Sequence, residues 1–158
     1  MGDCFALRPY CTGCRKWVDE KHECGDGRVI AVTEGTLEIV EALLDLGLKV
    51  YKATCYVHPD MEPYRKDTEY ALYVCIHLGE HYPPILFHDL PEGWKYHTET
   101  SSADRTPVEI LAYVQKGCWN SREDIETRIK AVVSEFVRYL REDKDKDGII
   151  AVLTLMWS

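Results

Sequence analysis

The chain has 158 residues, of which 46% are hydrophobic and 29% are charged, and its formal net charge at pH 7 is -8. This composition is typical of a globular protein and excludes a disordered chain. No apolar run approaches the ~20 residues of a membrane-spanning helix, and the first residues lack the basic and apolar regions of a signal peptide. We therefore expect a cytoplasmic protein without a membrane segment.

The negative charge is unevenly distributed along the chain. Residues 1–28 carry five basic and five acidic side chains, so the excess of acid lies entirely after residue 28. An acidic protein repels a phosphate backbone unless it has a local basic patch, and the sequence shows no basic stripe. We expect a protein partner or self-association, and the sequence argues against nucleic acid.

The first predicted elements are a strand, a helix and two more strands. Residues 28–33 form a short β-branched apolar run, which predicts a buried strand. Residues 36–46 have apolar side chains at helical spacing, and Gly47 suits a left-handed helix cap. Residues 48–57 and 68–78 are rich in strand-forming residues, so we expect them to be two strands joined by a proline-containing loop.

Two further helices are predicted in the second half of the chain. Over residues 106–117, Thr106 and Glu109 have the spacing of a capping box. Over residues 122–142, apolar side chains keep one face for several turns, and Ser121 suits the N-cap position. Both segments are therefore expected to be helical.

These elements and the last apolar run predict an α+β fold. We expect a hairpin with strands at 85–87 and 94–98, and a final strand at 148–157. The resulting βαββαβ order with an insertion is that of a ferredoxin-like sandwich, in which the first and third strands are central. We place this domain at residues 28–158. Because its last strand would be an apolar edge, we expect a homodimer or a protein partner there.

Residues 1–27 are predicted to form a separate zinc knuckle. Four of the seven cysteines lie between Cys4 and Cys24, in a chain without an export signal, where clustered cysteines favour metal binding over disulfides. Cys11 and Cys14 have the spacing of a knuckle, in which two thiolates of a tight turn bind one ion. A structural zinc site takes four protein ligands, and His22 and Cys24 complete the pattern C-x2-C-x7-H-x-C.

The knuckle and its HECG end resemble a single-knuckle zinc-ribbon-like unit, which implies a structural zinc ion. Cys4 is the alternative to His22 as the fourth ligand. A thioredoxin-type redox pair would follow a strand and open a helix, whereas Cys11 and Cys14 precede the whole predicted domain. We therefore expect a zinc-binding protein that acts as a binding or assembly module and not as an enzyme.

Two alternative functions stay open on the sequence alone. His77 and His81 match the H-x-x-E-H pattern of inverted zinc proteases, but that site needs a helix, and Gly79 with the nearby prolines indicates a strand end. If His77, His81 and His88 nevertheless converge on one loop, the protein would be a metal-dependent hydrolase. The third possibility is a nucleic-acid accessory protein that uses the zinc segment.

Overall fold

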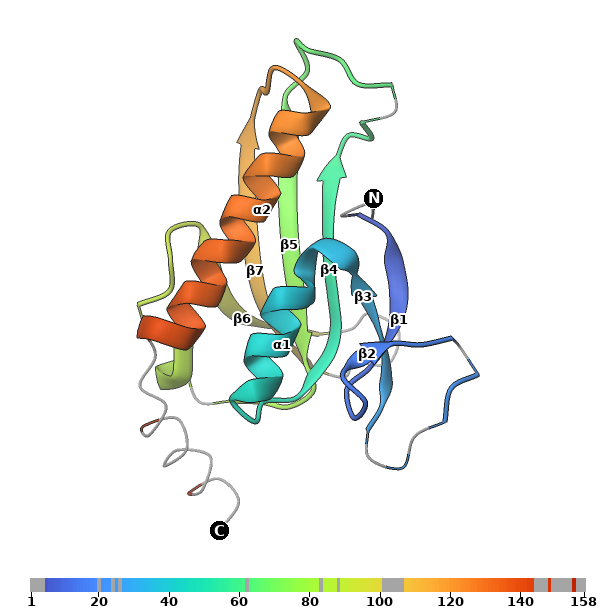
Figure 1. The fold of residues 1–158 in the computed structure, drawn as a ribbon. Coiled ribbons are helices and arrows are strands. Elements are labelled where there is room, and N and C mark those ends of the chain that lie inside the picture. Colours follow the sequence, from blue (N-terminus) through green and yellow to red (C-terminus); the bar gives the residue numbers. More distant parts are fainter. Residues whose placement is uncertain are drawn as a thin grey trace.

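A computed structural model of the chain describes residues 5–19, 21–23, 25, 27–61, 63–82, 84–87, 89–100, 107–143, 148 and 155. In this part of the chain, seven strands form one sheet and two α-helices lie on one face of it (Figure 1). The protein is therefore a mixed α+β protein, as the sequence predicted. The strands are β1 (Leu7–Cys11), β2 (Lys16–Trp17), β3 (Val29–Thr33), β4 (Val50–His58), β5 (Tyr70–Leu78), β6 (Trp94–Thr100) and β7 (Pro107–Gly117). The helices are α1 (Leu37–Asp45) and α2 (Arg122–Arg138), with 3-10 turns η1 (Glu34–Thr36) and η2 (Pro84–Phe87) and a π-helical turn η3 (Tyr139–Asp143).

The order of the sheet corrects the ferredoxin-like prediction. The strands follow the order β2-β1-β3-β4-β5-β7-β6, and β3 and β4 are parallel neighbours joined through α1. In a ferredoxin-like sandwich the third strand would separate the first two, but here β5 lies beyond β4. Of the predicted last strand at 148–157, only Gly148 and Leu155 are described, and both are helical. The expected dimer surface on that strand therefore lies outside the described residues.

The helix predicted over 106–117 is wrong, because Pro107–Gly117 form strand β7. This strand pairs with β5 over Glu109–Gly117 and with β6 over Pro107–Tyr113. Two ladders outweigh a local helix-capping pattern, because cross-strand packing routinely overrides intrinsic propensity. The strand predicted at 85–87 is also wrong, since it lies in the 3-10 turn η2, whereas the strand predicted at 94–98 is confirmed as part of β6.

The helices predicted over 36–46 and 122–142 are confirmed as α1 and as α2 with η3. At the start of α2, the Ser121 side chain accepts a hydrogen bond of 3.1 Å from the Asp124 backbone N–H, as the sequence predicted. Phe136 of α2 stacks on Trp94 of β6 with ring centroids 4.0 Å apart. Each fully buried apolar side chain of this face contributes about 1.5–3 kcal/mol. The buried residues of α2 are Ile125, Ile129, Val132, Val133 and Phe136. No helix in the described part of the chain is both long and apolar enough to cross a membrane.

The cysteine-rich segment contributes two strands to the same sheet. β1 pairs antiparallel with β3 from Leu7↔Thr33 to Cys11↔Val29, and β2 pairs with the end of β1. Tyr10 and Cys11 of β1 are fully buried. The segment is therefore anchored by backbone pairing and by core packing, in addition to any metal that it binds.

Glu109, which the sequence assigned to a helix cap, is a buried carboxylate in β7 with an exposure of 7%. It accepts hydrogen bonds from Thr98 Oγ1 at 2.8 Å and lies 2.9 Å from His81 Nδ1. Burial raises the pKa of Glu109, but the hydrogen bonds with His81 and Thr98 outweigh burial and lower the pKa overall. A carboxyl group whose pKa is lowered by folding stabilises the fold above its unfolded-state pKa, and this contribution is lost as the pH falls through the folded-state pKa.

We predict that Glu109→Gln lowers the free energy of unfolding by about 1–3 kcal/mol at neutral pH, because it removes charge-assisted hydrogen bonds inside the sheet. The difference from the unmodified protein should shrink as the pH falls through the acid range, since the wild-type carboxylate then becomes neutral too. Urea unfolding at several pH values measures this. Glu99→Gln, at an exposed position of β6 where the carboxylate pairs with His97, is the control and should change stability by less than about 0.5 kcal/mol. A penalty for Glu109→Gln that does not depend on pH would contradict the assignment.

Candidate metal centre

Cys11, Cys14 and His22 converge at the end of the β1–β2 hairpin. Their ligand atoms all lie within 4.8 Å of one another, and Cys14 Sγ is 3.5 Å from His22 Nε2. Cys11 is buried, His22 is half-buried and Cys14 is exposed. Among the residues that the structure describes, this is the one group of three or more His, Cys, Asp or Glu side chains close enough to bind a metal ion.

The two cysteines are positioned by the tight turn between β1 and β2. β1 ends at Cys11, and the backbone N–H of Cys14 points at Cys11 Sγ from 3.3 Å. The backbone N–H of Arg15 donates to the Cys11 carbonyl at 2.8 Å, and Arg15 has the left-handed φ of 59° that closes the turn. An N–H group aimed at sulfur stabilises the thiolate form, which is the form that binds metal.

His22 is brought back toward the cysteines by a turn at Asp19. The Asp19 carboxylate accepts a hydrogen bond of 2.9 Å from the Lys21 N–H, and the Asp19 carbonyl accepts one of 3.1 Å from the His22 N–H. Aspartate commonly starts a turn in this way, because its side chain mimics a backbone acceptor. The imidazole therefore approaches Cys14 through a local turn and not through a regular element.

A second contact holds the knuckle against the start of β3. Thr12 N–H donates to the Arg28 carbonyl at 3.0 Å, and Thr12 Oγ1 accepts from the Arg28 N–H at 3.0 Å. Next to this pair, a side chain on Gly27 would overlap the backbone nitrogen and Cα of Gly13. The knuckle turn thus packs so closely on residues 27–28 that only glycine fits at position 27.

The third anchor of the knuckle is ionic. Arg15 Nη2 lies 2.5 Å from Asp45 Oδ1 at the end of α1 and also donates to the Glu41 carbonyl at 3.2 Å. Arg141 of η3 approaches the other Asp45 oxygen at 3.0 Å. Hydrogen bonding from Arg15, followed by that from Arg141, holds the pKa of Asp45 below its usual range. The turn is therefore tied directly to the end of α1, and Asp45 in turn joins that end to η3.

One donor separation in this group can be compared with that expected around a zinc ion. With zinc–sulfur bonds of about 2.3 Å and zinc–nitrogen bonds of about 2.0–2.1 Å, a sulfur and a nitrogen donor at tetrahedral angles around one zinc ion stand roughly 3.5–3.6 Å apart. The 3.5 Å between Cys14 Sγ and His22 Nε2 agrees with that separation. Cys24, the remaining expected ligand, and Cys4, the alternative to His22, lie outside the described residues.

The histidines of the alternative hydrolase site are not gathered in the same way. His77 lies in β5, in register with Lys52 of β4 and Ile110 of β7, and burial followed by the charge of Lys52 lowers its pKa. His81 is instead paired with Glu109 at 2.9 Å. His88 lies outside the described residues, and within them neither His77 nor His81 belongs to a group of three potential metal ligands.

Sequence reasoning missed the residues that support the knuckle. Thr12, Arg15 and Gly27 act through partners far along the chain, so no local pattern identifies them. Comparison with known proteins adds no family for this site, because no family model, no curated protein and no solved structure matches the chain. The site must therefore be interpreted from its own donors and geometry.

We predict that Gly27→Ala weakens divalent-metal affinity by about tenfold or more, because the new methyl group pushes Gly13 and hence Cys14 out of place. Competition with a chromogenic chelator measures the change. Gly25→Ala is the matched control, since nothing lies within 4 Å of a side chain there, and its affinity should stay close to wild type. Equal affinities for the two variants would show that the close approach of Gly27 does not support the site.

Proposed function

We propose that Cys11, Cys14, His22 and Cys24 hold a structural zinc ion, and that the protein is a binding or assembly module. The observation that carries this proposal is the convergence of two thiols and one imidazole within 4.8 Å. Zinc favours such mixed sulfur and nitrogen donors in tetrahedral sites, whereas calcium and magnesium favour oxygen. Cys4 is the alternative to His22 in this ligand set.

The proposed ion has a structural role because of where its ligands lie. Cys11 ends a strand that is already paired with β3, whereas β2 has only two residues and His22 is held by a single turn. A bound ion would fix these short pieces to the end of β1, and binding energy of this kind acts as folding energy. A site closed by four protein ligands leaves no position for a catalytic water.

The role as a binding module follows from the rest of the chain. The net charge of -8 favours proteins over nucleic acids as partners. A cytoplasmic location and a homodimer through residues 148–157 belong to the same proposal. The hydrolase alternative has less support, because His81 pairs with Glu109. Among the described residues, His81 does not belong to a group of three potential metal ligands.

We predict that the purified protein contains about one zinc ion per chain and that Cys14→Ser abolishes this content. Serine keeps the size of the side chain but binds zinc far more weakly than a thiolate. Metal analysis by mass spectrometry measures the content, and Cys118→Ser, which removes the exposed thiol of Cys118, is the control. Full zinc content in Cys14→Ser would overturn the ligand set.

The fourth ligand is decided by a pair of variants. We expect His22→Ala to lose stoichiometric zinc and Cys4→Ala to keep it. The reason is that His22 Nε2 and Cys14 Sγ are 3.5 Å apart, which is the distance expected between two ligand atoms of one zinc ion. The absorption spectrum of the cobalt-substituted protein reports the number of coordinating thiolates independently of stability. Retention of zinc in His22→Ala together with its loss in Cys4→Ala would assign the position to Cys4.

A further inference from the structure

Strand β7 continues beyond the strand that pairs with its outer side. β6 covers β7 from Pro107 to Tyr113, but β7 runs on to Gly117 while still paired with β5 on its inner side. Along Val114–Gly117, no strand in the described part of the chain pairs with the outer side. Unpaired N–H and C=O groups at a strand edge are a template for another strand.

The gap beside this edge is produced by the turn that precedes β6. Trp94 N–H donates to the Pro91 carbonyl at 3.1 Å, and Gly93 has a φ of 89°, which favours glycine. A side chain on Gly93 would also overlap the Tyr113 ring. Residues 91–93 therefore turn away from β7 just before β6 begins at Trp94, and they do not pair with Val114–Gly117.

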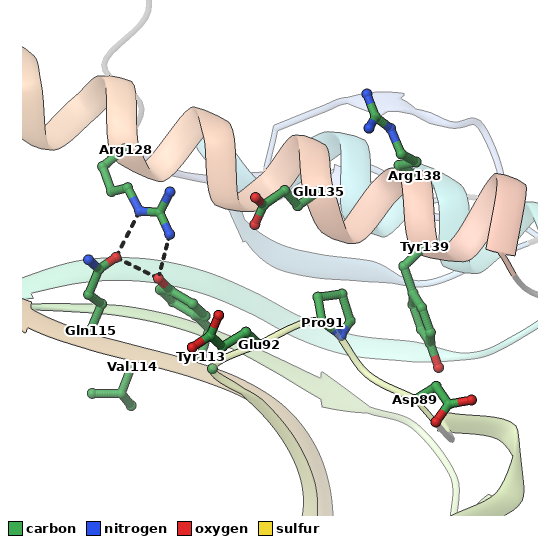
Figure 2. Close-up of a pocket in the computed structure, with 11 residues that line it drawn as sticks. Asp89, Pro91, Glu92, Tyr113, Val114, Gln115, Arg128, Glu135, Arg138 and Tyr139 are labelled. Atoms are coloured by element: carbon green, nitrogen blue, oxygen red, sulfur yellow. Dashed lines mark hydrogen bonds between the residues drawn. The ribbon is translucent and has the colours of Figure 1, made fainter.

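A cavity of about 620 Å³ lies at this gap, between the edge of β7, the turn before β6 and helix α2 (Figure 2). Its size is within the range of about 300–1,000 Å³ that ligand sites occupy. One wall is the strand edge itself, so an occupant would meet backbone groups on one side and side chains of α2 on the other. The lining includes Glu92, Gly93, Val114, Gln115, Glu135 and Tyr139.

The floor of the cavity is fixed by an internal hydrogen-bond network. Arg128 of α2 donates to Gln115 Oε1 at 2.8 Å and to the Tyr113 hydroxyl at 3.1 Å, and this hydroxyl in turn donates to Gln115 at 2.6 Å (Figure 2). The Arg128 guanidinium is thus directed at neutral acceptors that belong to the strand. The network holds α2 at a set distance from β7 and keeps the groove open.

The lining of the cavity has three acidic side chains, Asp89, Glu92 and Glu135, and two basic ones, Arg128 and Arg138, and Arg128 keeps its positive charge because its two acceptors are neutral. Glu92 and Glu135 line the cavity and are exposed, and no basic group of the described residues is within ion-pair distance of either. Arg138 also lines the cavity, but its side chain points away from the strand in Figure 2 and lies 3.6 Å from Glu142. Val114, which is 44% exposed, adds an apolar position on the edge.

We propose that Val114–Gly117 accept an extended peptide of a partner protein as an additional strand, in the groove between β7 and α2. Backbone hydrogen bonds to the strand edge would supply affinity, and alternate side chains would supply specificity. Basic side chains would face Glu92 and Glu135, and apolar side chains between them would cover Val114. This proposal deepens the binding-module function proposed above, since it names the class of partner.

The test uses the full-length, zinc-loaded protein labelled with nitrogen-15 and a blocked hexapeptide in which valine alternates with lysine. We expect the peptide to shift the backbone amide signals of residues 92–93 and 113–117, with those of β1–β4 unchanged. A peptide with glutamate in place of lysine should bind at least tenfold more weakly. Backbone N-methylation at alternate residues should abolish binding, because it removes the donors that strand pairing requires.

Charge reversal in the protein separates the groove from general electrostatics. Glu135→Lys should weaken binding of the valine–lysine peptide by tenfold or more, whereas Glu38→Lys, an identical change at an exposed position of α1, should leave it unchanged. Equal binding of the lysine and glutamate peptides, unaffected binding after N-methylation, or absence of binding would overturn the proposal. Self-association of the protein through residues 114–117 would also overturn it, by assigning the edge to a second copy.

Zinc content is measured in parallel for each protein variant. Loss of peptide binding in a variant with full zinc content would concern the groove alone. A protein that binds the peptide but contains no zinc would refute the metal proposal and leave the groove intact. The two proposals therefore fail independently.

Discussion

The antiparallel pairing of β1 with β3 is the interaction on which the candidate metal centre depends. The pairing ends at Cys11↔Val29, so the knuckle turn begins beside residues 27–28. There Thr12 of the turn accepts a hydrogen bond from Arg28. β3 then leads through η1 into α1, whose end carries Asp45, the partner of Arg15. Every long-range anchor of the knuckle thus comes from the segment that β1 pairs with or from a helix that follows it.

This pairing also explains why a short, polar segment can present ligands precisely. The entropy of ordering residues 12–28 is reduced when both ends of the segment are already fixed in one sheet. A metal ion then only has to order the loop between them. We therefore expect β1 to stay in the sheet when metal is removed, because its burial and its pairing with β3 do not depend on an ion.

The sequence was sufficient for elements whose stability is encoded locally. Helix α2 combines a serine cap with one continuous apolar face, so its capping signal and its hydrophobic pattern both predict a helix. The segment over 106–117 had a plausible cap as well, but its alternating apolar residues belong to a strand with neighbours on both sides. Strand order in the sheet depends on contacts between distant segments, and that is why the ferredoxin-like order failed while the α+β class was correct.

The same distinction applies to the site. Cys11, Cys14 and His22 could be predicted as a group because potential metal ligands of a small knuckle are close in sequence, and the structure brings them close in space. The fit of Gly27 against Gly13 and the Arg15–Asp45 pair join distant positions and could not be predicted in this way. The edge of β7 could not be foreseen from a segment interpreted as a helix.

The two ends of the sheet differ in how their edges are protected. On one side the sheet ends in β2, a strand of two residues, and very short edge strands resist further pairing. On the other side β6 carries Lys95 and Glu99 on exposed positions, and charged side chains also discourage pairing. Beyond Tyr113, where β6 stops, an exposed apolar residue, Val114, stands at an edge that the described chain leaves uncovered. The exposed Lys116 gives this stretch a charged side chain as well, so the apolar Val114 and the adjoining cavity are what distinguish it from the outer edge of β6.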